Sequence, residues 1–129
     1  MHGTGHKRSS ENCKTLNFTR NQIADEGLEA LAESPYLNNL ELLNANHNEI
    51  GDDGAIAIAN TENLPNLKDL SMFGNVIGDR GAQALADSPQ SKKYLKLDLY
   101  KNQYSRIGYK ALTESENLKN CEELEVYRE

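Results

Sequence analysis

The stretch Leu67-Lys68-Asp69-Leu70-Ser71-Met72-Phe73-Gly74-Asn75 decides the fold. Its apolar residues Leu70 and Met72 alternate with solvent-compatible ones just before an asparagine. Alternation with a period of two is typical of a short strand that has one buried face. The same arrangement occurs 27 residues earlier, from Leu40 to Asn48. The chain is therefore best interpreted as a repeat.

The 27-residue period continues through four units without an insertion or a deletion. The columns that keep it include the asparagines Asn21, Asn48, Asn75 and Asn102, the glycines Gly27, Gly54, Gly81 and Gly108, and the alanines Ala30, Ala57, Ala84 and Ala111. A fifth, truncated copy has Cys121, Leu124 and Val126 in the strand columns, and Glu129 where the asparagine is expected. Units of this size cannot bury their apolar face alone, so they must stack on one another.

After each asparagine the apolar period changes to that of a helix. Leu28, Leu31 and Ala32 form one apolar stripe at i, i+3 and i+4. Acidic residues at the helix starts, namely Asp25, Asp52 and Asp79, are expected to cap the first turns. Arg106 takes this place in the fourth unit, which predicts a weaker helix start there. The polar segment 88–93 predicts a mobile stretch on the helix side.

These residues resemble the leucine-rich repeat family, and the segment Ile50–Ala55 is similar to its ribonuclease-inhibitor-like subclass and bacterial relatives. The resemblance covers about residues 13–129. It implies an α/β fold, a right-handed solenoid with parallel strands on the concave side and short helices on the convex side. It also implies that the side chains of Asn21, Asn48, Asn75 and Asn102 form a ladder by bonding the backbone of adjacent turns. We divide the chain into a flexible N-terminal tail, 1–11, and a repeat domain, 12–129.

Composition limits the partners and the compartment. The 129 residues favour one domain, and 14 basic against 20 acidic residues give a net charge of −6, which disfavours nucleic acid and anionic membranes. No run approaches ~18 apolar residues, and the N-terminus has no secretory pattern.

Cys13 and Cys121 lie four units apart, roughly 19 Å at strand spacing, so we expect core thiols and no disulfide. A cytoplasmic protein is predicted, and delivery into a host cell remains open.

No constellation of catalytic residues converges in the sequence. His2 and His6 lie in the polar N-terminal tail, and His47, at the end of a strand, is expected to be a surface residue rather than a metal ligand. The acidic pairs recur with the period, which indicates helix caps rather than a catalytic dyad. The sequence therefore predicts no enzyme, no cofactor and no metal site.

The concave strand positions give the candidate binding residues. Phe73, Tyr100 and Tyr127 share one register on three successive strands, about 10 Å in all, and Asp98, Lys101 and Arg128 flank them. Exposed aromatic side chains beside mixed charge are typical of interaction hot spots. Aromatic pairs across strands also stabilise sheets without any partner, and this alternative remains open.

We therefore predict a non-catalytic module that binds another protein, not identified, through its concave face. The alternative is a regulator or adaptor of an enzyme, such as an inhibitor, a GTPase-activator-like protein or a fragment of a secreted effector. The C-terminal strand has no recognisable cap. A longer array, self-association through this edge, and simple fraying are three explanations that stay open.

Overall fold

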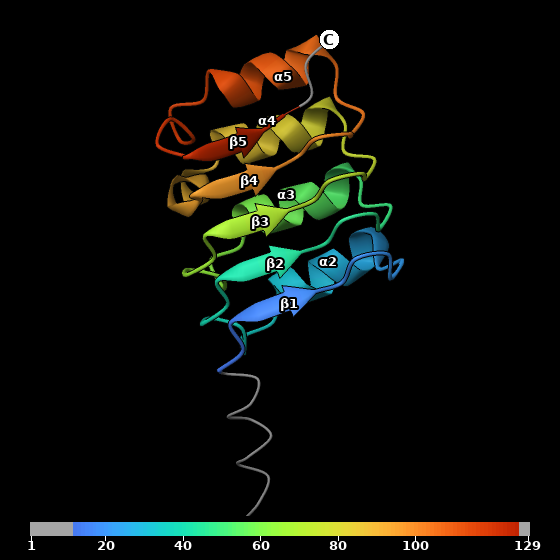
Figure 1. Ribbon diagram of the computed structural model, residues 1–129, viewed down its shortest axis with the longest axis vertical. Coiled ribbons are helices and arrows are strands. Elements are labelled where there is room, and N and C mark those ends of the chain that lie inside the picture. The colour runs from blue at the N-terminus through green and yellow to red at the C-terminus, as the bar shows by residue number, and fades with distance from the viewer. Residues whose placement is uncertain (1–11, 127–129) are drawn as a thin grey trace, which may run out of the picture.

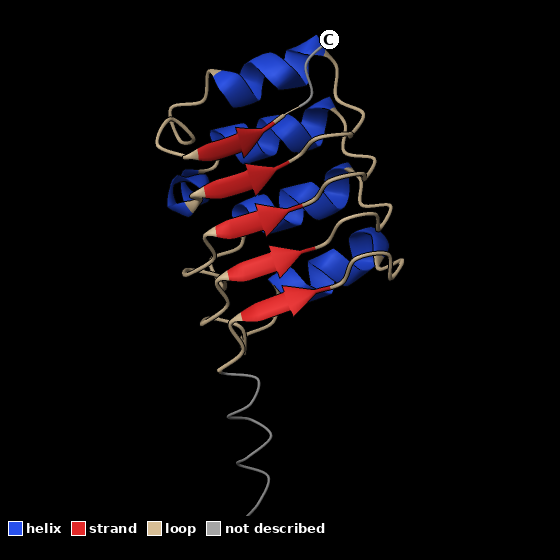
Figure 2. Ribbon diagram, viewed as in Figure 1, coloured by secondary structure: helices blue, strands red, loops and turns tan. Residues whose placement is uncertain are grey.

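The computed structural model describes residues 12–126, so the N-terminal tail 1–11 and the residues Tyr127, Arg128 and Glu129 lie outside the described part. Strands and helices alternate along the chain in two layers, with the strands side by side and the helices behind them (Figures 1 and 2). The elements in order are β1 (Thr15–Asn17), α2 (Ala24–Ala32), β2 (Leu42–Asn44), α3 (Asp52–Asn60), β3 (Asp69–Ser71), α4 (Asp79–Asp87), the 3₁₀ helix η1 (Pro89–Lys93), β4 (Lys96–Asp98), α5 (Arg106–Thr113) and β5 (Glu123–Glu125).

The five strands form one parallel sheet in chain order, β1-β2-β3-β4-β5. Every residue of a strand faces the residue 27 positions away, as in Leu16↔Leu43 and Leu43↔Leu70. The register of the sheet is thus the period of the sequence. The predicted α/β leucine-rich-repeat solenoid is confirmed.

The core lies between the two layers. Its strand side is the fully buried column Leu43, Leu70 and Leu97, and its helix side includes Leu28, Ile58 and Leu85. Two-turn to three-turn helices are not stable alone in water, so this shared burial holds them. The end strands are less covered, because Leu16 of β1 and Leu124 of β5 are only half-buried.

The recurring aspartates connect each helix to the next one. Asp52 Oδ1 accepts hydrogen bonds from the backbone N–H groups of Gly78 and Gly81, both at 2.8 Å, at the start of α4. Asp25 bonds the start of α3 in the same way. The prediction that these acids act as helix caps is correct, but each one caps the helix of the following unit rather than its own.

This arrangement overturns the weak helix start predicted at Arg106. Asp79 Oδ1 accepts from Ser105 N and Gly108 N, both at 2.8 Å, and Ser105 Oγ donates to Asp79 Oδ2 at 2.7 Å. Ser105 Oγ also accepts from Ile107 N at 3.2 Å. The start of helix α5 is therefore capped by Asp79 of the preceding unit. Arg106 at the first position of this helix removes none of these hydrogen bonds.

Hydroxyl groups make the matching connection at the other end of the helices. Thr61, Ser88 and Ser115 each donate to a carbonyl 29 residues earlier, at 2.5 Å, on Ala32, Ala59 and Ala86 respectively. The segment 88–93, for which the sequence predicts mobility, forms η1 instead. Ser91 is buried there and donates to the Leu85 carbonyl at 2.7 Å, so a polar residue fits a column that otherwise holds leucine.

Candidate functional site

The asparagine column fixes the turns that follow the strands. Asn75 Oδ1 accepts from Asn48 N at 2.8 Å and from Ile50 N at 3.0 Å, and its Nδ2 donates to the Ala45 and Met72 carbonyls. Asn48 and Asn102 make the corresponding bonds to their preceding units. Asn21 is exposed, because no unit precedes it within the described residues. The face of the sheet therefore rests on a firmly bonded backbone.

The residue before each of these asparagines has a left-handed backbone. The φ angles are 60° at Arg20, 58° at His47, 73° at Gly74 and 58° at Lys101. The sequence interpretation treated this column as strand residues that point to the concave side, but the chain turns there. Gly74 was the residue in the sequence that could have indicated this turn, because glycine adopts a positive φ without strain. Lys101 consequently lies in a turn beyond Tyr100 and not on a strand.

A row of rings crosses the face of the sheet that points away from the helices, which we call the strand face. Phe73 and Tyr100 are stacked, with ring centroids 6.3 Å apart and planes at 19°. The His47 ring meets the Phe73 ring edge-on at 5.2 Å and 79°. Tyr100 is 40% exposed. The structure thus brings Phe73 and Tyr100 together, adds His47, which is not one of the predicted binding residues, and does not describe Tyr127.

The N-terminal half of the strand face is polar and bonded to itself. Thr19 Oγ1 donates to Asn17 Oδ1 at 2.7 Å and to Asn44 Oδ1 at 3.0 Å. Ser71 Oγ donates to Asn46 Oδ1 at 2.7 Å, and the same oxygen accepts from Phe73 N at 2.8 Å. These side chains form hydrogen bonds with one another across the strands. Fewer of their donors and acceptors are therefore left for a partner.

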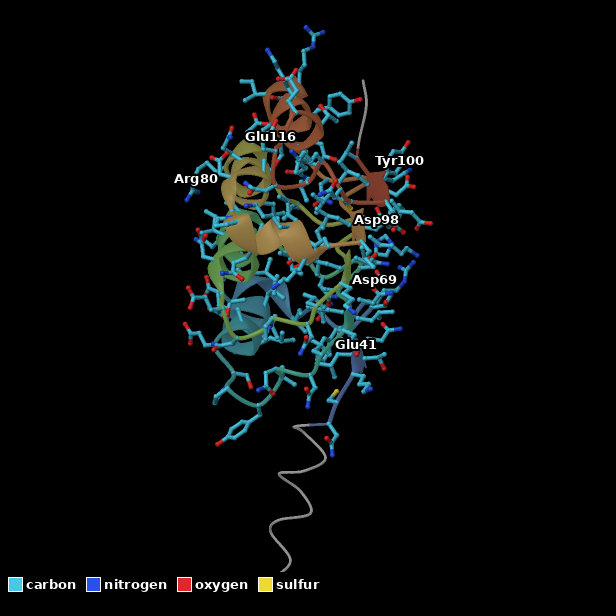
Figure 3. The ribbon with its side chains drawn as sticks, turned by 90° about the vertical axis from the view of Figure 1, so that its left-hand side faces the viewer. Glu41, Asp69, Arg80, Asp98, Tyr100 and Glu116 are labelled. Carbon is cyan, nitrogen blue, oxygen red and sulfur yellow. The ribbon has the colours of Figure 1, made fainter. Side chains whose placement is uncertain are left out.

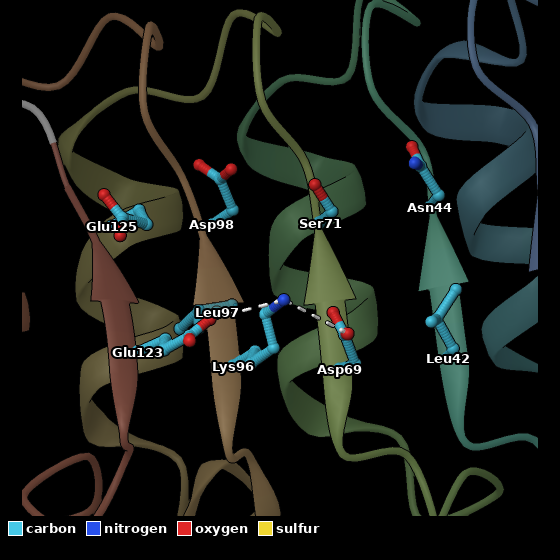
Figure 4. Close-up of a pocket in the computed structure, with 9 residues that line it drawn as sticks. All are labelled: Leu42, Asn44, Asp69, Ser71, Lys96, Leu97, Asp98, Glu123 and Glu125. Carbon is cyan, nitrogen blue, oxygen red and sulfur yellow. Dashed lines mark ion pairs between the residues drawn. The ribbon is translucent and has the colours of Figure 1, made fainter.

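An acidic hollow of about 410 Å³ lies on the strand face and extends from β2 to β5 (Figure 4). Lys96 Nζ lies 3.3 Å from Glu123 Oε1 and 3.9 Å from Asp69 Oδ2. The hydrogen bond with Glu123, followed by the charges of Glu123 and Asp69, raises the pKa of Lys96 above its usual range. Lining the hollow are Leu42, Asn44, Asp69, Ser71, Lys96, Leu97, Asp98, Glu123 and Glu125. The lining thus holds four carboxylates and one ammonium group, which pairs with two of them.

The ring row and the hollow lie on one side of the molecule. Figure 3 shows Tyr100, Asp98 and Asp69 on the strand side and Arg80 on the helix side. Asp98 is two residues before Tyr100, and its Oδ1 accepts from Tyr100 N at 3.0 Å. The predicted binding residues Phe73, Tyr100 and Asp98 are therefore neighbours, while Arg128 lies outside the described residues.

The described part of the chain offers little other chemistry. Across residues 12–126, no group of three or more His, Cys, Asp or Glu side chains is arranged to hold a metal ion. None of the described helices combines the length and apolar character needed to cross a bilayer. Cys13 and Cys121 are free and half-buried near opposite ends of the sheet, and burial raises the pKa of the Cys121 thiol. They are less covered than core thiols because the end units have fewer neighbours.

Comparison with known proteins agrees with this architecture. A family model described as "Leucine Rich repeat" matches residues 12–32, 36–59 and 63–86. No curated protein matches the chain. A solved structure of the leiomodin-1 actin-binding site 2 (ABS2) is 16% identical, with a TM-score of 0.74, over 100% of this chain and 81% of that one. The tropomodulin C-terminal domain of Caenorhabditis elegans is 17% identical, with a TM-score of 0.68, over 95% and 77% of the two chains. At these identities the likeness is one of fold.

Proposed function

Because the chain belongs to the leucine-rich repeat family, which the family model matches within residues 12–86, we propose that it is a non-catalytic module that binds another protein through its concave strand face. The observation that carries the proposal is the stacked pair Phe73 and Tyr100, which stands partly exposed beside the acidic hollow. The 27-residue unit and the segment Ile50–Ala55 support placing the chain in the ribonuclease-inhibitor-like subclass. A bacterial source remains a prediction from the regularity of the repeat.

The physical argument is one of preorganisation. Large aromatic side chains contribute contact area and few rotatable bonds, so ordering them costs little on binding. The backbone below them is held by the bonds of Asn75 and Asn102. Polar and charged groups around the rings match the usual anatomy of an interface, with an apolar centre and a polar rim.

The test compares two variants that each remove two large side chains. Phe73→Ala/Tyr100→Ala removes the ring pair, and Tyr36→Ala/Ile107→Ala removes two exposed hydrophobic residues elsewhere, 46% and 68% exposed. Each protein is used as bait in a lysate, and captured proteins are quantified by mass spectrometry and then purified for titration. We expect at least one protein whose affinity falls by ~10-fold or more with the ring variant alone. Equal capture by the wild type and both variants, with circular dichroism showing intact folds, would refute the proposal.

Actin is the first purified protein to titrate, because the leiomodin-1 structure is that of an actin-binding site built on the same fold. Co-sedimentation with filaments and a binding assay with monomers cover both forms of actin. Loss of binding in the ring variant alone would identify actin as a partner. Absence of binding would remove actin and leave the face to be tested with other proteins.

A regulator or adaptor of an enzyme is the alternative within the same proposal, since the same face would make the contact. It is favoured if the captured protein is an enzyme whose rate changes on addition of the wild type but not of the ring variant. We expect the chain itself to be inactive in broad hydrolase assays. The acidic charge and the two free thiols support a cytoplasmic site of action, and microscopy of a tagged chain tests it. Sedimentation tests self-association through the edge of β5.

A further inference from the structure

We infer that the acidic hollow binds an arginine side chain carried by an extended basic segment of the partner protein. The inference rests on the proposed function and names the chemistry of the partner. It draws on three features of the strand face, namely its charge, its rings and its length.

The charge of the hollow is unbalanced. Lys96 forms ion pairs with Glu123 and Asp69. Asp98 of β4 and Glu125 of β5 face each other in register. Like charges placed directly opposite on neighbouring strands destabilise a sheet, so a cation bound between these two carboxylates would relieve a repulsion that the fold otherwise carries. The site therefore selects for a positively charged group.

The rings distinguish arginine from lysine. Tyr100 lies two positions beyond Asp98 on the same face, with Phe73 stacked on it. A guanidinium group is planar, so it stacks on an aromatic ring and donates two parallel hydrogen bonds to a carboxylate, whereas an ammonium group is a compact point charge. An acidic pair beside an exposed ring fits the first group better than the second.

The length of the hollow indicates an extended segment. Its lining runs from Leu42 on β2 to Glu125 on β5. These four strands span about 14 Å at the usual strand spacing, which four or five residues of extended chain would cross. The hollow lies on the face of the sheet that the helices leave uncovered, so the segment enters from that side and lies over the Lys96 ion pairs.

The probe is a labelled synthetic peptide in which arginine alternates with glycine, and its lysine counterpart serves as a comparison. Fluorescence anisotropy measures binding to the full chain at low and at physiological salt. We expect the arginine peptide to bind more tightly, and Asp98→Asn/Glu125→Gln to weaken it by ~10-fold or more. The matched control Glu33→Gln/Glu62→Gln changes the net charge equally at exposed positions away from the hollow, and is expected to stay within ~2-fold of the wild type. Tyr100→Leu should abolish the preference for arginine over lysine.

Three results would overturn the inference. Equal effects of the two acidic variants would mean that only net charge attracts the peptide, and equal binding of the lysine peptide would remove the role of the ring. A partner captured through Phe73 and Tyr100 in the absence of peptide binding would leave the proposed function standing and refute this inference alone.

Discussion

The first unit, 13–39, and the third unit, 67–93, follow the same template but have different surroundings. In the third unit Leu70 and Met72 are fully buried, and Asn75 is only 5% exposed. In the first unit Leu16 and Phe18 are half-buried, and Asn21 is exposed. The residue types are alike, so the difference comes from neighbours, which the third unit has on both sides. Each unit is therefore stabilised mainly by contacts that another unit provides.

The two units also differ on the strand face. In the first unit the Thr19 hydroxyl bonds Asn17 of its own unit and Asn44 of the next one. The third unit has Ser71 and Phe73 in the same columns, and Phe73 stacks with a ring of the next unit. Polar side chains in these columns form hydrogen bonds within the sheet, whereas the aromatic rings in the same columns are also partly exposed. The template thus carries a polar version of one strand, bonded within the sheet, and an aromatic version that lies partly exposed.

The largest expected effect comes from removing the asparagine side chain in each unit. Asn75→Ala leaves the buried amides of Asn48 and Ile50 without their acceptor, which should reduce the free energy of unfolding by about 3 kcal/mol. Asn21→Ala changes an exposed side chain and should cost less than about 1 kcal/mol. Urea unfolding measures both. Equal losses would contradict the view that neighbours determine the contribution of this column.

A smaller effect is expected at the left-handed position before the asparagine. Gly74→Ala should destabilise the fold by about 1–2 kcal/mol, since φ is +73° and a Cβ there would overlap the His47 ring. Arg20→Gly in the first unit should stabilise the fold by up to about 1 kcal/mol. The φ angle there is +60°, which glycine adopts without strain, and the Arg20 side chain that would be removed is exposed. Thermal melts measure both. A stabilising Gly74→Ala would show that the turn does not require its left-handed backbone.

The sequence predicts the repeating parts of this fold well, because the period alone determines which residues become neighbours. A constant spacing of 27 places Leu16, Leu43, Leu70, Leu97 and Leu124 in one line, and the structure has that register. A strand pattern followed by a helical one then permits few arrangements other than a stacked solenoid.

Relations between units are less evident from the sequence. Asp52 has the residue type and the position of a helix cap. In a repeat, however, such an acid can bond the start of its own helix or the start of the next one, and only the folded structure shows that it bonds the next one. The contact of His47 with Phe73 could not be predicted, because alternation along a strand does not reveal that a left-handed turn aims the His47 ring at Phe73. Tyr127 and Arg128, two of the candidate binding residues, remain predictions because the described chain ends at 126.

The smallest effect tests whether an acid of the third unit supports the fourth. The pKa of Asp79 is lowered from 3.8, first by the Ser105 hydroxyl and then by backbone N–H groups, against an opposing effect of burial. A carboxyl group whose folded pKa lies below its unfolded value stabilises the fold above the unfolded value, and this contribution is lost as the pH falls through the folded one. Asp79→Asn should therefore melt lower than the wild type at neutral pH, and the gap should close in acid. The exposed Glu26→Gln on α2 serves as the control and should show no such closing gap. A difference in melting temperature between Asp79→Asn and the wild type that stays constant from neutral pH to pH ~2 would contradict this view. It would mean that the charge of this carboxylate does not stabilise the start of α5, and that only uncharged contacts join the two units there.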